Sequence, residues 1–293
     1  MQRQQRRRGG QGMDDMLETI LDSLGLEGRM AEVQRVQTAH RMRLAEFWGI
    51  RQGARVLEIG CGQGDTTAVL ACRVGPSGLV RGVDIAPPGY GAPMTVGEAA
   101  ARLQQSRIGG PVRMEFGLDV LQDDVDFGEN AYDEIVFSHS SWYLQSPEQL
   151  ERLLARARRW GRRLCFAEWD PRIGRIGQLP HLLAVLVQAQ AECFKTDSEA
   201  NVRTLLAPAD IRRIAHSAGW SVDEEATLPA SGLQDGGWEV DLALGELAEE
   251  LPRLHGLPRK SRQLLESQLG LLAAYASAGS SFESMDSWAM TAG

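Results

Sequence analysis

A glycine-rich segment in the first third of the chain has the composition of a ligand-binding turn. It runs from Val56 to Gly64 as VLEIGCGQG and is followed by Asp65. Glycines at alternate positions allow the backbone to turn sharply and leave no side chain between it and a ligand. Asp65 is a favourable N-cap residue, so a helix is expected to begin there. The segment predicts a strand, a turn that can hold a small molecule, and a helix.

The spacing of these glycines argues against a dinucleotide. A pyrophosphate-binding turn requires G-x-G-x-x-G, whereas this chain has Asp65 where the last glycine would stand. A second acid, Glu58, precedes the first glycine by two residues. Carboxylates beside a helix N-terminus would repel a pyrophosphate group. A ligand that lacks phosphate and carries a positive charge fits this turn better.

Three later segments form a pattern together with the glycine turn. Asp84 ends the second strand-like run, Asp119 follows the third, and the fourth begins at Tyr132 as YDEIV. In this order the four features resemble the class I S-adenosylmethionine-dependent methyltransferases. The resemblance covers roughly residues 50 to 170 and, more loosely, the last two strands. The stiff loop PPGYG over 87–91 departs from the family pattern, in which this connection is shorter.

The resemblance implies S-adenosylmethionine as the cofactor and gives roles to individual residues. The glycine turn would hold the amino-acid end of the cofactor, and Asp84 would accept hydrogen bonds from both ribose hydroxyls. Asp119 would face the adenine amino group, with the backbone N–H of Val120 on the ring. The cofactor-binding residues predicted in this way are Glu58, Gly60, Cys61, Gly62, Gly64, Asp84, Ile85, Asp119, Val120, Ser138 and His139.

The residues after the fourth and fifth strand-like runs have the types needed at a reaction centre. Ligands of open α/β sheets lie beyond the carboxyl ends of the strands, and there we predict His139, Glu168 and Asp170 as catalytic residues. Methyl transfer from a sulfonium needs alignment of the reacting atoms, and needs a base only when the acceptor must lose a proton. His139 is the expected base, with Glu168 or Asp170 orienting it or acting directly. Alternatively, His139 binds backbone or positions the methionine end, and Glu168 is purely structural.

Aromatic side chains gather at the same strand ends and in segments that could cover them. Trp142 and Tyr143 follow the fourth run, and Trp169 follows the fifth. His40 lies on the apolar face of an N-terminal helical pattern, and Trp238 lies in a downstream insertion. We predict that all five bind the acceptor, which favours an aromatic acceptor. The alternative for each of them is an ordinary packing role.

Short apolar runs alternate with helical patterns over the centre of the chain. Such alternation predicts right-handed crossovers and a parallel sheet covered by helices on both faces. The expected strands are 55–60, 79–84, 112–116, 132–138, 163–168, 220–228 and 283–291. The expected helices are 65–74, 94–106, 147–160, 178–195, 208–218, 237–252 and 259–277, after two N-terminal helices that begin near 13 and 29.

The predicted fold class is therefore α/β, a Rossmann-like seven-stranded and mostly parallel sheet with a helical cap. We expect a disordered basic tail over 1–12 and N-terminal cap helices over 13–50. The cofactor-binding core would comprise 51–177, 207–229 and 281–293, and the helical cap insertions would comprise 178–206 and 230–280.

Bulk composition narrows the class of protein. The chain has 293 residues, 43% of them hydrophobic, and a formal net charge of −8. This acidic balance argues against nucleic acid as a partner, because phosphate binding draws on clustered positive charge. The four cysteines, at 61, 72, 165 and 193, lack metal-site spacing, so no metal is expected. No signal peptide or membrane-spanning run is recognisable, which favours a cytoplasmic location without membrane association.

The leading hypothesis is a methyltransferase that acts on a small organic acceptor, aromatic and of secondary-metabolite type, by C-, N- or O-methylation. Helical additions can enclose a pocket for such an acceptor. A methyltransferase directed at protein or RNA would instead need an open, charged platform. A third hypothesis keeps the fold without methyl transfer, as in a cyclase or a binding subunit, because fold does not fix function.

Overall fold

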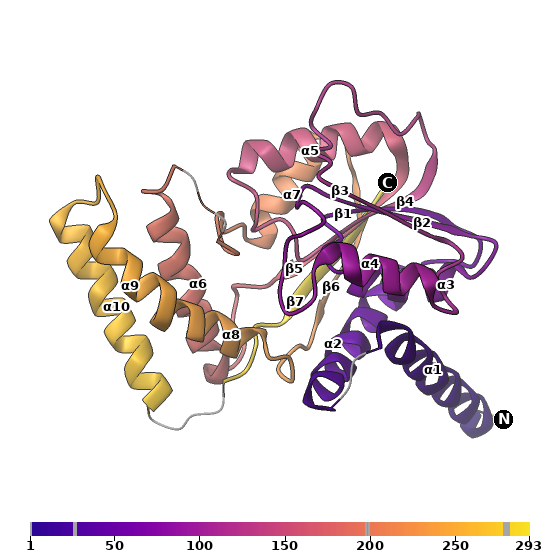
Figure 1. Ribbon diagram of the computed structural model, residues 1–293, viewed down its shortest axis with the longest axis horizontal. Coiled ribbons are helices and arrows are strands. Elements are labelled where there is room, and N and C mark those ends of the chain that lie inside the picture. Colours follow the sequence, from indigo (N-terminus) through magenta and orange to yellow (C-terminus); the bar gives the residue numbers. More distant parts are fainter. Residues whose placement is uncertain (1, 26–27, 197, 199, 278–281) are drawn as a thin grey trace.

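A seven-stranded sheet runs through the centre of the molecule, with helices on both of its faces (Figure 1). The computed structural model describes residues 2–25, 28–196, 198, 200–277 and 282–293. The strands are β1 (Arg55–Ile59), β2 (Leu79–Asp84), β3 (Val112–Phe116), β4 (Tyr132–Ser138), β5 (Gly161–Trp169), β6 (Val222–Leu228) and β7 (Ser287–Ala292). Their order is β3-β2-β1-β4-β5-β7-β6, and only β7 runs antiparallel to its neighbours. The predicted Rossmann-like fold class is confirmed.

The helices divide into those that cover the sheet and those that stand beside it. They are α1 (Gln2–Leu24), α2 (Gly28–Phe47), α3 (Asp65–Val74), α4 (Val96–Gln105), α5 (Pro147–Trp160), α6 (Leu179–Glu192), α7 (Pro208–Ser217), α8 (Asp235–Leu242), α9 (Ala248–Glu250) and α10 (Arg259–Ser277). Figure 1 shows α5 and α7 over one face of the sheet and α1 to α4 over the other. None of the helices in the described part of the chain is long and apolar enough to cross a membrane.

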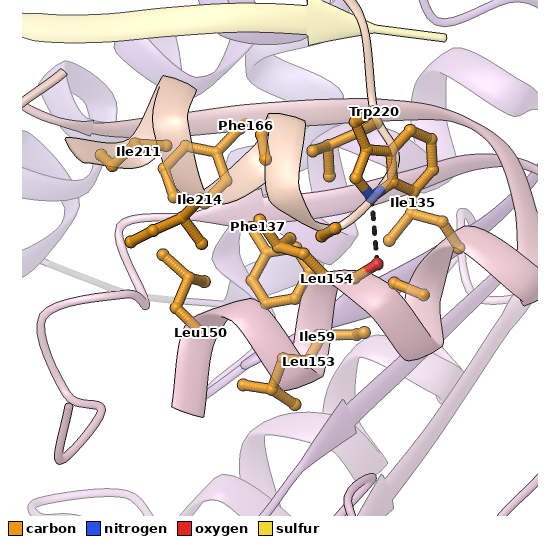
Figure 2. Packing of buried hydrophobic residues seen from close by; sticks show 14 of the residues in the cluster. Ile59, Ile135, Phe137, Leu150, Leu153, Leu154, Phe166, Ile211, Ile214 and Trp220 are labelled. Atoms are coloured by element: carbon orange, nitrogen blue, oxygen red, sulfur yellow. Dashed lines mark hydrogen bonds between the residues drawn. The ribbon is translucent and has the colours of Figure 1, made fainter. Parts of the chain in front are cut away.

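The face under α5 and α7 buries the larger apolar core. Leucines at 150, 153 and 154 recur at helical spacing on α5, so one face of that helix packs on the sheet. Figure 2 shows this face against Phe137 of β4 and Phe166 of β5. Trp220, just before β6, is also buried and donates its indole N–H to the carbonyl of Leu154 at 3.0 Å. The packing holds the carboxyl ends of β4 and β5 rigidly in place.

Helices α6 and α8 to α10 form a bundle with an apolar core of its own (Figure 1). The expected helix over 237–252 is divided, because a π-helical segment, Ala243–Leu247, and a 3₁₀ turn, Leu251–Arg253, interrupt it. The bundle stands beside the carboxyl ends of the strands, where α8 approaches α2.

The structure corrects the sequence prediction near both ends of the chain. Residues 2–12, expected to be part of a disordered tail over 1–12, belong to α1, and Met1 lies outside the described residues; glutamine and arginine are good helix formers. The last strand begins at Ser287 instead of 283, because the side chains of Glu283 and Asp286 bind the loop that follows β5. Arg175 donates to Glu283 at 2.6 Å and to Asp286 at 2.8 Å.

Candidate active site

One cavity of about 900 Å³ lies at the carboxyl ends of β1, β2, β4 and β5. Its floor comes from the strand ends, and it is bordered by α2 and α8, which are nearly two hundred residues apart in the sequence. The two helices meet where Gln37 donates to the carboxylate of Asp235 at 2.6 Å. The cavity is therefore enclosed by segments from both ends of the chain.

The glycine turn lies on the cavity floor and requires glycine for two reasons. Gly60, Gly62 and Gly64 have φ values of 79°, 51° and 89°, in the left-handed region that favours glycine. A β-carbon on Gly60 would lie 2.6 Å from the β-carbon of Ser140. Gly60, Cys61 and Gly62 line the cavity, whereas Gly64 does not and instead caps α3. The predicted N-cap, Asp65, is the first residue of that helix.

Asp65 is held by α2 beside the cavity. Gln34 donates to its carboxylate at 2.9 Å, and Arg41 forms an ion pair with it at 3.4 Å. Both partners come from α2, the helix on which only His40 was predicted to have a role in binding. The helix therefore brings a guanidinium group and polar side chains against the start of α3.

Glu58 is a buried acid beneath the glycine turn. Its side chain is 2% exposed, and Thr67 donates to it at 2.5 Å. Burial raises the pKa of Glu58 to about 8, against the effect of this hydrogen bond and of the Arg41 charge. The carboxyl group lines the cavity. A positive charge placed in the cavity would favour its ionised form.

Asp84 closes the turn from the end of β2. Its carboxylate accepts the backbone N–H groups of Gly62 at 2.8 Å and Ala86 at 2.9 Å. One bond goes to each oxygen, and a carboxylate oxygen has a second lone pair. Asp84 therefore fixes the turn and can still accept hydrogen bonds from a ligand in the cavity.

The remaining residues predicted for the adenine side also line the cavity. Asp119 forms a turn in which its carboxylate accepts the backbone N–H of Leu121 at 2.8 Å. Val120 is buried, whereas Ile85 is 65% exposed. The side chain of Ile85 thus lies at the rim and Val120 in the wall.

His139 follows β4 in a left-handed backbone conformation with φ of 52°. Its Nε2 lies 2.9 Å from the hydroxyl oxygen of Ser287, and Nε2 of His40 lies 2.8 Å from the same oxygen. Burial, with the charges of His40 and Arg41, lowers the pKa of His139 well below its usual value. His139 and His40 both line the cavity, and both are neutral near pH 7.

Glu168 and Asp170 have different surroundings although they are two residues apart. Glu168 is buried, lines the cavity and accepts the hydroxyl of Ser141 at 2.6 Å; burial raises its pKa to about 7. Asp170 does not line the cavity, and Arg172 donates to both of its oxygens at 2.8 and 2.7 Å. The structure therefore does not bring Asp170 together with the other predicted catalytic residues, because its carboxylate is engaged in an ion pair outside the cavity.

The four predicted aromatic residues line the same cavity. Trp142 is buried and donates its indole N–H to the carbonyl of Leu206 at 3.2 Å. Trp238 and Tyr143 are about half exposed, so they lie near the opening. The ring of Trp169 lies 4.7 Å from that of His139, measured between centroids. Aromatic surfaces from β4, β5 and α8 thus face one space.

Several residues that line the cavity were not predicted from the sequence. Asp235 and Glu239 lie four residues apart on α8, on the same face as Trp238, and a search for polar residues at helical spacing could have found them. His181 lies edge-on to Trp169 with ring centroids 5.3 Å apart. Ser287 does not line the cavity but contacts His139, which does. It has no local signal at all, because only the pairing of β7 with β5 brings it to His139.

The charge of the cavity favours a cation. Seven carboxyl groups line it, against two guanidinium groups, those of Arg41 and Arg203. In the described part of the chain, no group of three or more His, Cys, Asp or Glu side chains could hold a metal ion. The glycine floor, the free lone pairs of Asp84 and the excess of acidic side chains fit a ligand with a sugar and a cationic end, as S-adenosylmethionine has.

Known proteins are similar to this chain in sequence and in fold. A family model described as a methyltransferase domain matches residues 56–163. Methyltransferase phomM' of Diaporthe leptostromiformis is 30% identical over 266 residues, which cover 75% of this chain and 67% of the relative. A crystal structure of a cyclopropane-fatty-acyl-phospholipid synthase-like protein from Lactobacillus casei superimposes with a TM-score of 0.85. It is 31% identical, and the match covers 95% of this chain and 99% of the other.

Proposed function

The chain belongs to the class I S-adenosylmethionine-dependent methyltransferases, and we propose that it methylates a small organic acceptor that carries an aromatic ring. S-adenosylmethionine is the cofactor, and when bound it supplies an electrophilic methyl group on a sulfonium ion. The observation that carries the proposal is that Trp142, Tyr143, Trp169 and Trp238 line the cavity that also contains the glycine turn. An acceptor of secondary-metabolite type fits a space of about 900 Å³ that must also hold the cofactor.

The cofactor would occupy the half of the cavity formed by β1 and β2. Gly60, Cys61 and Gly62 would approach its amino-acid end through backbone groups, since no side chain intervenes at the glycines. The free lone pairs of Asp84 would accept the ribose hydroxyls, and Asp119 with Val120 would border the adenine ring. The carboxyl of Glu58 would offset the positive charge of the ligand from beneath the turn.

The acceptor would lie against the aromatic side chains. Trp142 forms a rigid wall, because its indole N–H is already bound to Leu206. Trp238 and Tyr143 lie near the opening and would cover the acceptor after it enters. Aromatic rings bind flat apolar ligands and also stabilise positive charge above their faces. An acceptor covered by these side chains would lie in an enclosed site. A protein or an RNA would instead need an open platform.

Glu168 is the group best suited to remove a proton from the acceptor. A base works best when its pKa lies near the working pH, and burial raises the pKa of Glu168 to about 7. The carboxyl lines the cavity, and Ser141 holds one of its oxygens. Glu168 would thus receive the proton of an acceptor N–H, O–H or C–H group as methyl transfer proceeds.

A second candidate reaction rests on the name of the Lactobacillus casei protein, which is like a cyclopropane-fatty-acyl-phospholipid synthase. Addition of the methyl group to a carbon–carbon double bond, followed by loss of a proton from that methyl group, closes a cyclopropane ring. Aromatic faces would stabilise the positive charge that develops, and Glu168 would receive the proton. An unsaturated acyl chain would then replace the aromatic acceptor.

One experiment distinguishes the two reactions. The protein is incubated with methyl-labelled S-adenosylmethionine in parallel reactions. Each reaction contains one class of acceptor: indoles, phenols, aromatic amines or monounsaturated phospholipid vesicles. We expect label in an aromatic product together with stoichiometric S-adenosylhomocysteine. Label in cyclopropane lipid would favour the second reaction, and a crystal structure with S-adenosylhomocysteine outside the glycine turn would overturn both.

A further inference from the structure

Four side chains form a continuous hydrogen-bonded chain from the protein surface to the cavity. Arg43 Nη2 lies 3.1 Å from His40 Nδ1. His40 Nε2 lies 2.8 Å from the hydroxyl oxygen of Ser287, which in turn lies 2.9 Å from His139 Nε2. The members come from α2, β7 and the end of β4, so only the folded protein brings them together.

The direction of this chain follows from its first member. A guanidinium group can only donate hydrogen bonds, so His40 Nδ1 must be the acceptor. A neutral His40 then carries its proton on Nε2, and this N–H donates a hydrogen bond to the hydroxyl oxygen of Ser287. Neutrality is expected, because burial, with Arg43 and Arg41, lowers the pKa of His40 to about 3.

The hydroxyl hydrogen of Ser287 then has one acceptor within reach. Ser287 is fully buried, and in the described structure its hydroxyl contacts only the two histidines. His40 uses its Nε2 as a donor, so the hydroxyl hydrogen must go to His139 Nε2 or remain without a partner. A buried hydroxyl without an acceptor is costly.

We propose that Arg43, His40 and Ser287 are positioning residues that fix His139 in the tautomer protonated at Nδ1. His139 thereby presents a neutral N–H donor to the cavity, while its lone pair faces Ser287. Among the described residues, the hydrogen-bond partner of Nδ1 is the hydroxyl oxygen of the adjacent Ser138 at 3.4 Å, which is long for a hydrogen bond. The donor therefore remains available to an oxygen atom of a ligand.

This assignment changes the role of His139 in the proposed reaction. The part of the inference that concerns ligand binding rests on the proposed function. The sequence suggested His139 as the base, but a nitrogen that already carries a proton cannot take one from the acceptor. Glu168 then remains as the base, and His139 would orient a ligand by donating to its oxygen. That oxygen could belong to the cofactor carboxylate or to the acceptor.

The test is the tautomer of His139 in the full-length protein, read from long-range ¹H–¹⁵N correlation spectra with ¹⁵N-labelled histidine. The chain has five histidines, so assignment with single His→Asn variants is practical. We expect one tautomer for His139 near neutral pH, with the proton on Nδ1. A wild-type spectrum with the proton on Nε2 would overturn the proposal.

Variants at the exposed end of the chain test its direction without disturbing the core. Arg43→Met removes the donor, whereas Arg43→Lys keeps one, and Arg43 is exposed so that both should fold. We expect a tautomer mixture at His139 in Arg43→Met and the wild-type pattern in Arg43→Lys. In a Ser287→Ala background, Arg43→Met should change nothing further. An unchanged His139 spectrum in Arg43→Met would contradict the chain.

Titration with two cofactor analogues identifies the ligand oxygen. S-adenosylhomocysteine has the amino-acid carboxylate, and 5′-methylthioadenosine lacks it. A shift of the His139 Nδ1–H resonance with the first analogue alone assigns the donor to the cofactor carboxylate. If neither analogue shifts this resonance, the Nδ1–H donor of His139 is assigned to the acceptor. Because the tautomer is measured without turnover, failure of this inference is distinguishable from failure of the proposed function.

Discussion

Gly60 and Ser140 approach so closely that a β-carbon on the glycine would lie 2.6 Å from the β-carbon of the serine. The contact joins the end of β1 to the segment after β4, and the hydroxyl of Ser140 donates to the carbonyl of Ile59 at 3.2 Å. At this point of the cavity floor the backbone of Gly60 packs directly against the side chain of Ser140, with no room for a second side chain between them.

Gly60→Ala should therefore destabilise the protein and weaken cofactor binding. Both the clash and the left-handed φ of 79° oppose a β-carbon, so we expect a loss of about 2–4 kcal/mol in the free energy of unfolding. Chemical denaturation measures it. Gly270 lies in α10 with open space around it, so Gly270→Ala should instead raise stability by about 0.5–1 kcal/mol. Equal effects at both sites would contradict the contact.

Asp84→Ala should weaken the binding of S-adenosylhomocysteine by about 1–3 kcal/mol, the range for losing a partner of a buried polar group. The variant removes the acceptor of two backbone N–H groups as well as the lone pairs proposed for the ribose. Isothermal calorimetry measures the affinity, with the exposed Asp124→Ala as control. Unchanged affinity in Asp84→Ala would show that the sugar lies elsewhere.

Methyl transfer should accelerate as the pH rises through about 7, because Glu168 accepts a proton only when ionised. Glu168→Gln should remove this limb of the pH profile and lower turnover by about 10²–10⁴-fold. The rate is measured with an acceptor found in the screen. Asp170→Asn is the matched control, and it should keep the limb, since Asp170 lies outside the cavity. A limb that survives in Glu168→Gln would assign the base to another group.

Cofactor binding should release protons near pH 7. In the free protein the pKa of Glu58 is about 8, so its carboxyl is largely protonated, and a cationic ligand lowers that pKa. Calorimetry in buffers of different ionisation enthalpy counts the protons, and Glu58→Gln should release fewer.

The raised pKa of Glu58 means that the folded state binds more protons than the unfolded state between about pH 4.5 and pH 8. Free-protein stability should therefore fall as the pH rises through this window.

Trp238→Ala should raise the KM for an aromatic acceptor by about tenfold, since a buried aromatic contact contributes roughly 1–1.5 kcal/mol. The side chain is 48% exposed, so its removal should leave the free energy of unfolding nearly unchanged. Leu264→Ala on α10, at 54% exposure, provides a control of similar exposure away from the cavity. An unaltered KM in Trp238→Ala would remove this residue from the acceptor site.

The sequence alone determined the sheet and predicted most residues that line the cavity beside β1 and β2. Apolar runs that end at glycine or an acid predicted the bounds of β1 to β4 to within one residue. Strands of a parallel sheet are buried on both faces, so their residues must be mostly apolar. The glycine turn and Asp84 end neighbouring parallel strands, so the expected pairing of β1 with β2 was enough to bring them together. Asp65 shows the limit of this approach, since the helix cap is Gly64 and not the acid that follows it.

Tertiary structure alone decided which side chains share the half of the cavity proposed for the acceptor. Glu168 and Asp170 look alike in the sequence, yet only the first lines the cavity, because Arg172 engages the second. Ser287 reaches His139 through antiparallel pairing of β7 with β5, and α2 meets α8 through Gln37 and Asp235. Such contacts join segments far apart in the chain, so their partners depend on how the elements pack and carry no local signal.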